Sequence, residues 1–305
     1  MQHTVRIILV ALTGLAGFSS PAVSASDESV APVLWLPAMN VFRRFENDAT
    51  EMYSFYTDVL GFESLTTFDV GNNTQVMRIG AGASELKLTR RVDNRKYVAG
   101  GVTNATGLRL WTFFYSDEAA LSQRFIDHGL QPPDFAPLGD AGKRTAIVSD
   151  PDGQLVELVI TGDEPGTQYD EIEVGFVVSD MEASLEFYRD FVGLEELPPV
   201  HDARWNTTKH AFRNGSTIVT LRSFDTSLPQ DTGSAGIQYV VSDADHVDRL
   251  AKERSIVIDQ PLSGLAGFSL RTIWLDDPDG ITNYFAETGQ SREAAANSAD
   301  ADDAR

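Results

Sequence analysis

The 305-residue chain has no cysteine, which excludes both a disulfide framework and a lipid anchor on an N-terminal cysteine. It has few cations: 24 Lys and Arg stand against 45 Asp and Glu, and the formal net charge is −21. A field of this sign repels phosphates, so nucleic acid and anionic membranes are poor partners. The chain also lacks an apolar run of the roughly 20 residues that span a bilayer, and we expect no stable membrane insertion.

Residues 1–25 have the pattern of a secretory signal peptide. Arg6 supplies the positive start, residues 7–18 form a short apolar segment, and residues 23–25 are the small residues of a cleavage site. We therefore expect cleavage near Ala25 and a periplasmic or secreted protein.

Two sequence signatures occur twice. The segment Phe55–Phe62 (FYTDVLGF) is followed by Asp-Pro-Asp-Gly at 150–153, and Phe187–Leu194 (FYRDFVGL) is followed by Asp-Pro-Asp-Gly at 277–280. A repeat this long indicates two copies of a whole domain. Asp-Pro-Asp-Gly is itself a turn sequence, because Pro presets φ and Gly closes a type I turn. We expect it to join the last two strands of each domain.

Composition divides the chain into domains. Residues 33–162 form the first unit, residues 163–170 are a polar linker, and residues 171–288 form the second unit. Residues 289–305 are rich in Ala, Ser and Asp without apolar periodicity, which predicts a disordered tail. Within each unit the hydrophobic periodicity predicts a strand, a helix and three strands, twice over.

This order of elements, with FYxDxxG on the first helix and DPDG before the last strand, resembles the vicinal oxygen chelate (VOC) superfamily of glyoxalases, bleomycin-resistance proteins and extradiol dioxygenases. The resemblance covers nearly all of residues 33–288. It implies an α+β fold of two tandem VOC domains, each a pair of βαβββ modules that form an incomplete barrel around a cup. Both motifs serve helix packing and turn formation, so they indicate a fold rather than an activity.

Activity in this family usually depends on a divalent metal ion, held by side chains from the first and fourth strands of each module. In the first domain the resemblance places these positions at Asn40 or Val41, Lys87, Leu110 and Glu157. An ammonium group repels a metal cation, so we interpret Lys87 and Glu157 as an ion pair in place of the metal. The alternative is that Lys87 points into solvent.

In the second domain the same positions fall at Glu173, Thr220, about Gly236, and Tyr284. A tyrosine phenol binds hard divalent ions poorly at neutral pH, because it must first lose a proton with a pKa near ~10. Each domain therefore keeps one convincing donor, and we expect no cofactor. The alternative is a divalent metal ion held by Glu173, His201 and His210, although histidines in a hairpin region are more often simply solvated.

Side-chain alternation along strands predicts what each cup presents to a ligand. The second cup should show Glu173, Thr220, Arg222, Gln238 and Tyr284, and the first should show Arg43, Lys87 and Glu157. Glu173 is the candidate general base if burial raises its pKa. The alternative is a salt-bridged floor without chemistry.

Three hypotheses follow for the function. We favour a metal-independent protein that binds a small-molecule ligand and is a monomer. The second hypothesis is a lyase, isomerase or dioxygenase of glyoxalase or extradiol type centred on the second domain. The third is a rigid scaffold for an interaction partner, which a filled cup would support.

Overall fold

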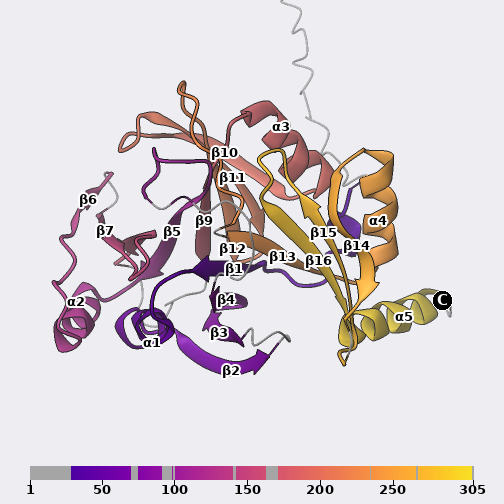
Figure 1. Ribbon diagram of the computed structural model, residues 1–305, viewed down its shortest axis with the longest axis horizontal. Coiled ribbons are helices and arrows are strands. Elements are labelled where there is room, and N and C mark those ends of the chain that lie inside the picture. The colour runs from indigo at the N-terminus through magenta and orange to yellow at the C-terminus, as the bar shows by residue number, and fades with distance from the viewer. Residues whose placement is uncertain are drawn as a thin grey trace, which may run out of the picture.

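The computed structural model describes residues 29–69, 75–90, 98, 100–139, 142–162, 171–233, 235–265 and 267–303. Four modules of one design follow each other along the chain, each with a strand, a helix and three further strands (Figure 1). The α+β class and the βαβββ modules are confirmed. The expected signal peptide and linker lie outside the described residues. Within the described ranges, no helix has the length and apolar character needed to cross a membrane.

The first half of the chain supplies two modules. Module 1 contains β1 (Asn40–Phe45), α1 (Ala49–Ser54) with a wider helical turn at Phe55–Val59, β2 (Glu63–Asp69), β3 (Gln75–Ala81) and β4 (Ser84–Arg90). Module 2 contains β5 (Gly107–Tyr115), α2 (Glu118–Asp127), β6 (Ala136–Leu138), β7 (Lys143–Ser149) and β8 (Leu155–Ile160).

The second half repeats this order. Module 3 contains β9 (Ile172–Val177), α3 (Met181–Leu185) with a wider turn at Glu186–Phe191, β10 (Glu195–Asp202), β11 (Thr207–Asn214) and β12 (Thr217–Arg222). Module 4 contains β13 (Ala235–Val241), α4 (Ala244–Glu253), β14 (Val257–Gly264), β15 (Leu270–Asp276) and β16 (Thr282–Thr288).

An aspartate begins each of the four module helices. Its carboxylate accepts hydrogen bonds from backbone N–H groups of the first helical turn, which have no partner within the helix. The four residues are Asp48, Asp117, Asp180 and Asp243. Because the same cap recurs at the same place, the duplicated sequence fixes where each helix starts.

The strands form two sheets of eight, and each sheet combines modules from both halves of the chain. Sheet A has the order β14-β15-β16-β13-β1-β4-β3-β2 and joins modules 1 and 4. Sheet B has the order β10-β11-β12-β9-β5-β8-β7-β6 and joins modules 2 and 3. The antiparallel pairs β1·β13 and β5·β9 make the two junctions. The sequence led us to expect each cup within one half of the chain, whereas each cup is shared between the halves.

One hydrophobic core connects all four modules. It contains central-strand residues from each of them, Val41, Trp111, Val174 and Ile237, all fully buried. Helix residues such as Tyr56 and Tyr188, from the duplicated FYxDxxG motif, belong to the same cluster. The face of each sheet that bears the helices is therefore the packed face, and the opposite face is left to form a cup.

The Asp-Pro-Asp-Gly turns join β7 to β8 and β15 to β16, as the sequence predicts. In each turn the glycine N–H donates to the carbonyl oxygen of the first aspartate, at 2.9 Å. Gly153 and Gly280 have φ values of 82° and 74°, a left-handed conformation that favours glycine. The motif therefore has a structural role in both halves.

The segment after module 4 differs from our expectation. Helix α5 (Gly289–Asp303) occupies the region where the sequence predicts a disordered tail. Its start is fixed by Ser291, which is fully buried and donates through Oγ to the Val241 carbonyl oxygen at 2.7 Å. Ala294–Ala296 then favour a helix, since alanine has the highest helix propensity.

Candidate functional site

The pairing of the sheets decides which predicted residues share a cup. We call cup A the face of sheet A that carries Lys87, Gln238 and Tyr284, and cup B the face of sheet B that carries Glu157 and Glu173. In cup A, Gln238 of β13 is in register with Asn40 of β1 and with Tyr284 of β16. In cup B, Thr112 of β5 is in register with both Glu157 of β8 and Glu173 of β9.

This arrangement overturns the predicted ion pair of Lys87 with Glu157. The Lys87 ammonium donates to Gln238 Oε1 and lies 3.7 Å from the Glu85 carboxylate, in cup A. Glu157 lies in cup B and is paired with Arg204 at 2.9 Å. Removal from water lowers the pKa of Lys87, while the Glu85 carboxylate opposes that shift.

The first-strand position in module 1 is Asn40 rather than Val41. The Asn40 amide donates to Gln238 Oε1 at 3.3 Å, and its oxygen accepts from the Glu85 backbone N–H at 2.9 Å. Val41 is fully buried in the core. A one-residue change of register moves every side chain of a strand to the other face, so this choice also moves Arg43 out of the cup.

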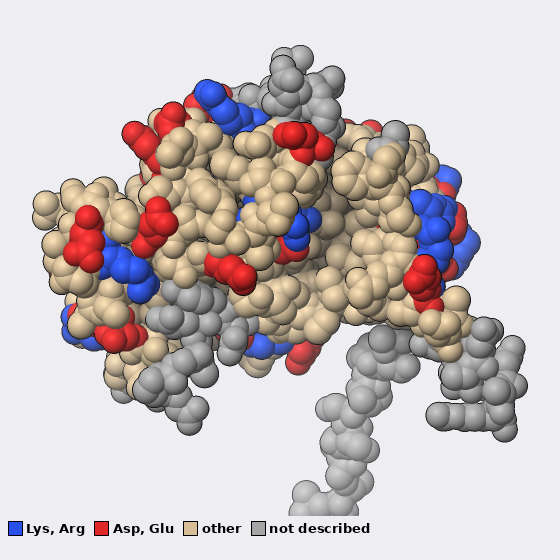
Figure 2. Space-filling view, turned by 90° about the horizontal axis from the view of Figure 1, so that it is seen from below, with Lys and Arg blue, Asp and Glu red and all other residues tan. Residues whose placement is uncertain are grey.

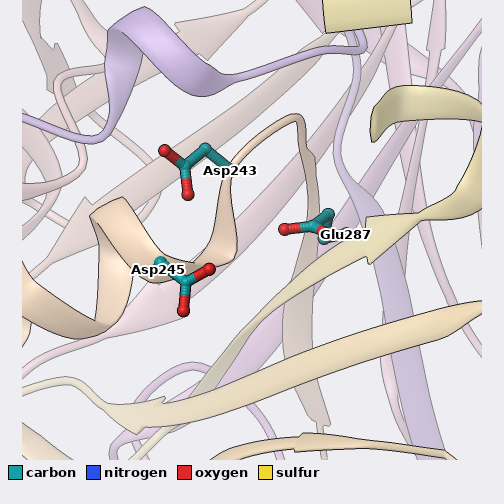
Figure 3. Close-up of side chains that lie close together, drawn as sticks. All are labelled: Asp243, Asp245 and Glu287. Carbon is teal, nitrogen blue, oxygen red and sulfur yellow. The ribbon is translucent and has the colours of Figure 1, made fainter. Parts of the chain in front are cut away.

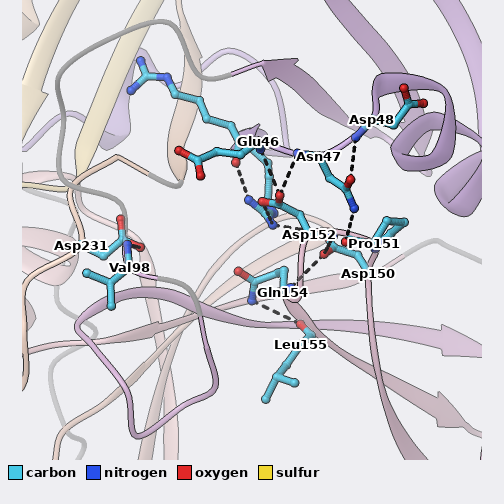
Figure 4. A network of polar contacts seen from close by, with 12 residues as sticks. Glu46, Asn47, Asp48, Val98, Asp150, Pro151, Asp152, Gln154, Leu155 and Asp231 are labelled. Atoms are coloured by element: carbon cyan, nitrogen blue, oxygen red, sulfur yellow. Dashed lines mark hydrogen bonds and ion pairs between the residues drawn. The ribbon is translucent and has the colours of Figure 1, made fainter.

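Arg43 lies on the packed face, where it binds the turn of module 2 instead of a ligand. It is 1% exposed, and its Nη2 lies 3.3 Å from Asp150 Oδ2 and 3.2 Å from Asp152 Oδ2. Asp152 also accepts from the backbone N–H groups of Glu46 and Asn47 (Figure 4). The predicted role of Arg43 in ligand binding is therefore replaced by a structural one.

The two Asp-Pro-Asp-Gly turns differ in charge compensation. Burial raises the pKa of Asp150, and the neighbouring Arg43 guanidinium opposes that shift. Asp277 accepts from the Tyr188 hydroxyl at 2.8 Å and from the Asp279 and Ile281 backbone N–H groups, at 3.0 and 2.9 Å. Burial nevertheless raises the pKa of Asp277 to about 7.

A cluster of three aromatic side chains lies in cup A. The rings of Phe42, Trp274 and Tyr284 contact one another, with centroids 5.1 to 6.4 Å apart. A Cβ added at Gly236 would lie 2.1 Å from the Phe42 ring, so glycine is needed to admit that ring. Burial raises the pKa of the Tyr284 phenol. The metal position at Tyr284 is thus taken up by a packed, protonated phenol.

Cup B is hollow. A cavity of about 440 Å³ lies over β5, β8 and β9, and its floor includes Thr112, Glu157 and Glu173. Thr112 donates to Glu157 Oε2 at 3.2 Å, and Thr145 donates to Oε1 at 2.9 Å. Two carboxylates that the sequence assigned to different cups therefore lie on one floor, on either side of a threonine.

Three ion pairs line this cavity. Arg204 pairs with Glu157 at 2.9 Å, Lys209 pairs with Glu173 at 3.1 Å, and Arg222 pairs with Asp202 at 2.8 Å. Arg222 also donates to the Thr220 hydroxyl at 3.1 Å. Arg222 and Thr220 thus face cup B as predicted, and the Arg222 guanidinium is paired with Asp202.

The residues of cup B do not fit a metal site of the family type. His201 lines the cavity, whereas His210 lines a separate hollow with Met181 and Phe224, on the far side of β11 from Lys209. Among the described residues, the donor atoms of Glu157, Glu173 and His201 do not all lie within 4.8 Å of one another. Each floor carboxylate is instead paired with a cation. The alternative site of Glu173, His201 and His210 is not assembled.

A cluster of acidic side chains does occur elsewhere, at the start of α4. Donor atoms of Asp243, Asp245 and Glu287 lie within 4.8 Å of one another (Figure 3). Arg271 pairs with Asp245 at 2.8 Å and with Glu287 at 3.3 Å, and Arg292 pairs with Glu287 at 2.5 Å. These arginines compensate Asp245 and Glu287, so the cluster serves to anchor α4 and α5 to β15 and β16.

One face of the molecule shows how the charges are distributed. On the face shown in Figure 2, acidic and basic side chains are scattered among uncharged ones. Cup B instead gathers charged side chains that the sequence did not point to, namely Lys143, Asp202, Arg204 and Lys209, and the sequence did not point to Trp205 beside them either. The sequence signal for Asp202, Arg204 and Lys209 is that they are charged residues of one hairpin, β10–β11, whereas Lys143 comes from β7.

Comparisons with known proteins agree with this architecture. The family model described as Glyoxalase/Bleomycin resistance protein/Dioxygenase superfamily matches residues 38–158 and 172–285. Glyoxalase I from Zea mays is 19% identical, with a TM-score of 0.63 over 82% of this chain and 92% of that chain. A mutant of glyoxalase I from Zea mays is 18% identical, with a TM-score of 0.64 over 84% and 93%.

A putative dioxygenase from Bacillus subtilis is 12% identical, with a TM-score of 0.59 over 84% of this chain and 86% of that chain. No curated protein matches the sequence. At these identities, the likeness to solved structures shows the fold alone.

Proposed function

Because this chain belongs to the Glyoxalase/Bleomycin resistance protein/Dioxygenase superfamily, we propose that it binds a small organic molecule in cup B, without a metal site of the family type. The observation that carries the proposal is the cavity of about 440 Å³ in cup B, a size within the roughly 300–1,000 Å³ of ligand pockets. Cup A is a poor candidate, since Phe42, Trp274 and Tyr284 occupy it.

The walls of cup B can both hold and orient a ligand. One side offers the apolar groups of Phe114, Val159 and Trp205, and the floor and rim offer paired charges. Such a mixture of apolar walls and a few fixed polar groups is typical of binding pockets. Lys209 holds the Glu173 carboxylate at 3.1 Å, so Glu173 serves in this proposal as a polar contact rather than as a general base.

Export and the monomeric state are part of the proposal. The signal-peptide pattern of residues 1–25 supports export, and N-terminal sequencing of the protein from the culture fluid or periplasm should begin at Ser26. Both cups are completed within one chain, which supports a monomer. Light scattering after size-exclusion chromatography should give a mass close to that of one mature chain.

The test of ligand binding uses Trp205, the tryptophan that lines the cavity. We would screen a small-molecule library for quenching of the intrinsic fluorescence and repeat each titration with Trp205→Phe and with Trp274→Phe. Ligands of cup B should lose their quenching signal in Trp205→Phe and retain it in Trp274→Phe, because Trp274 lies in cup A. Hits that depend on Trp274, or a library without any hit that depends on Trp205, would contradict the proposal.

Elemental analysis tests the proposal that cup B works without a metal site of the family type. We expect no stoichiometric iron, manganese, zinc or nickel after incubation of the purified protein with each ion. A metal that binds one per chain and is lost in Glu173→Ala would overturn the metal-free assignment.

A further inference from the structure

We infer that cup B selects small organic anions with an apolar body, an inference that rests on the proposed function and names its ligand class. The charges that line the cavity carry it. Four cations, Lys143, Arg204, Lys209 and Arg222, stand against three carboxylates, Glu157, Glu173 and Asp202. The cavity therefore has a surplus positive charge in a chain whose formal net charge is −21.

In two of the three ion pairs, the cation is the more exposed partner. The side chain of Arg204 is 33% exposed and that of Glu157 is 14% exposed. The side chain of Lys209 is 22% exposed and that of Glu173 is 14% exposed. A molecule that enters the cup therefore meets N–H donors before it meets the carboxylates. A guanidinium has five N–H donors and an ammonium has three, so both retain donors for a second acceptor.

Lys143 provides the surplus charge. It lies on β7 at the edge of the cavity, and among the described residues no carboxylate comes within ion-pair distance of its ammonium group. Arg204 reaches the cavity from the hairpin between β10 and β11, on the module 3 side. A ligand carboxylate in the cup can therefore contact cations from both modules of sheet B, Lys143 from module 2 and Arg204 from module 3.

The apolar part of the cavity fixes the rest of the ligand. Leu138, Val159, Val200 and Trp205 offer hydrocarbon and indole surface beside the cations. An inorganic anion would leave this surface wet, whereas an organic anion covers it. The overall negative field of the protein does not attract anions, so selection must come from contacts inside the cup.

The experiment compares three ligands of one shape and three charges: phenylacetate, phenylacetamide and phenethylamine. For about ten non-hydrogen atoms, dissociation constants of about 1–10 mM are expected, and ligand-observed NMR measures them. The affinity for phenylacetate should exceed that for phenethylamine at least about fivefold, with the amide between them. The preference should decrease in high salt.

Substitution of Lys143 locates the effect. Lys143→Gln should weaken phenylacetate binding about fivefold, and Lys143→Glu should bring phenethylamine to at least equal affinity. The matched control is Lys252→Gln, a lysine on α4 with a 63% exposed side chain, which should leave all three affinities unchanged. Circular dichroism would check that the variants are folded.

The outcomes separate this inference from the proposed function. Stronger binding of phenethylamine than of phenylacetate to the wild-type protein would overturn the anion inference and leave ligand binding in cup B intact. A preference for phenylacetate that Lys143→Gln does not reduce would also overturn it, because the cations of cup B would not be its source. Absence of binding for all three compounds at about 10 mM would contradict both, since a fitting cavity should retain at least millimolar affinity.

Discussion

The two cups are built from different pairs of modules of one design, modules 1 and 4 for cup A and modules 2 and 3 for cup B, and their contents differ at matching positions. In cup A the junction pairs Phe42 with Gly236, whereas in cup B it pairs Gly175 with Leu110. The neighbouring position holds Tyr284 in cup A and Glu157 in cup B. A ring on the first strand occupies part of cup A, and glycine at the matching position lies beside the cavity of cup B. The fold thus sets the frame, and a few inward residues decide how much of the cup remains open.

The turns of the two sheets differ in the same way. The sheet B turn at Asp150 is compensated by Arg43, which comes from β1 of sheet A. The sheet A turn at Asp277 relies on a tyrosine hydroxyl and backbone N–H groups, and its carboxyl keeps a pKa of about 7. One copy of the motif is therefore stabilised by an ion pair between sheets, and the other by neutral hydrogen-bond donors.

The largest expected effect on stability comes from removing the cation at the sheet B turn. Arg43→Met should lower the free energy of unfolding by about 3–5 kcal/mol, because it leaves the buried Asp150 carboxylate without its cation. Urea denaturation measures the loss. The control is Arg78→Met, whose partner Glu85 is partly exposed, and it should cost less than about 1 kcal/mol. If both variants lost the same free energy of unfolding, the buried ion pair at the turn would contribute no more to stability than the partly exposed one.

The next effect concerns Asp277 and pH. Its folded-state pKa of about 7 lies above the ordinary value of 3.8, so the folded state binds the proton more tightly than the unfolded state. Its contribution to stability is full below pH 4, decreases between about pH 4 and pH 7, and is lost above pH 7, a total of about 4 kcal/mol.

Asp277→Asn should remove this decrease, so that the variant gains stability relative to the wild type as the pH rises. Thermal unfolding between pH 4 and pH 8 measures it. Asp127→Asn on α2, at an exposed site, is the control and should leave the decrease in place. A wild-type protein whose stability stays level across this range would contradict the assignment.

A smaller effect should follow from opening cup A. Phe42→Ala should lower the free energy of unfolding by about 2–4 kcal/mol, because it removes contacts with Trp274 and Tyr284 and leaves a cavity. Urea denaturation and the fluorescence of Trp274 would report it. Phe114→Ala in the already hollow cup B should cost about 1 kcal/mol or less. A reversed order would show that cup A is not the packed one.

The smallest expected effect on stability comes from Arg204→Gln. Its partly exposed pair with Glu157 contributes less than about 1 kcal/mol to folding. The variant leaves the Glu157 carboxylate facing the cavity, so the affinity for phenethylamine should rise a few-fold, as NMR titration would show. Arg213→Gln, which removes an equally exposed arginine from its pair with Glu171, should cost a similarly small amount of stability and leave the affinity for phenethylamine unchanged. An unchanged affinity of Arg204→Gln for phenethylamine would mean that Arg204 does not shield Glu157 from the ligand.

Much of the fold follows from the sequence because its signals are local. Periodicity and capping residues set the modules, and Asp-Pro-Asp-Gly sets the turns. Alternation correctly places Glu173, Thr220, Gln238 and Tyr284 on cup faces. Alternation cannot tell whether these residues share a cup. That depends on which modules pair, and the modules pair through backbone hydrogen bonds at β1·β13 and β5·β9.

Two parts of the site could not be predicted from the sequence, for physical reasons. The face that Arg43 occupies depends on a one-residue choice of register in β1, which no turn or cap specifies. The cations Arg204 and Lys209 reach the cavity from a hairpin whose pairing shifts between Leu197 and Val200. Such an irregularity interrupts alternation, so the face of each later residue cannot be counted from the strand start.

The exchange of modules between the two halves also bears on how the protein arose. A single ancestral unit with this topology would have completed its cups only by pairing with a second copy, and symmetry would then have made both cups identical. Fusion of two copies ended that constraint, because a substitution now alters one cup and leaves its counterpart untouched. One cup was thereby free to become a packed support while the other kept its hollow.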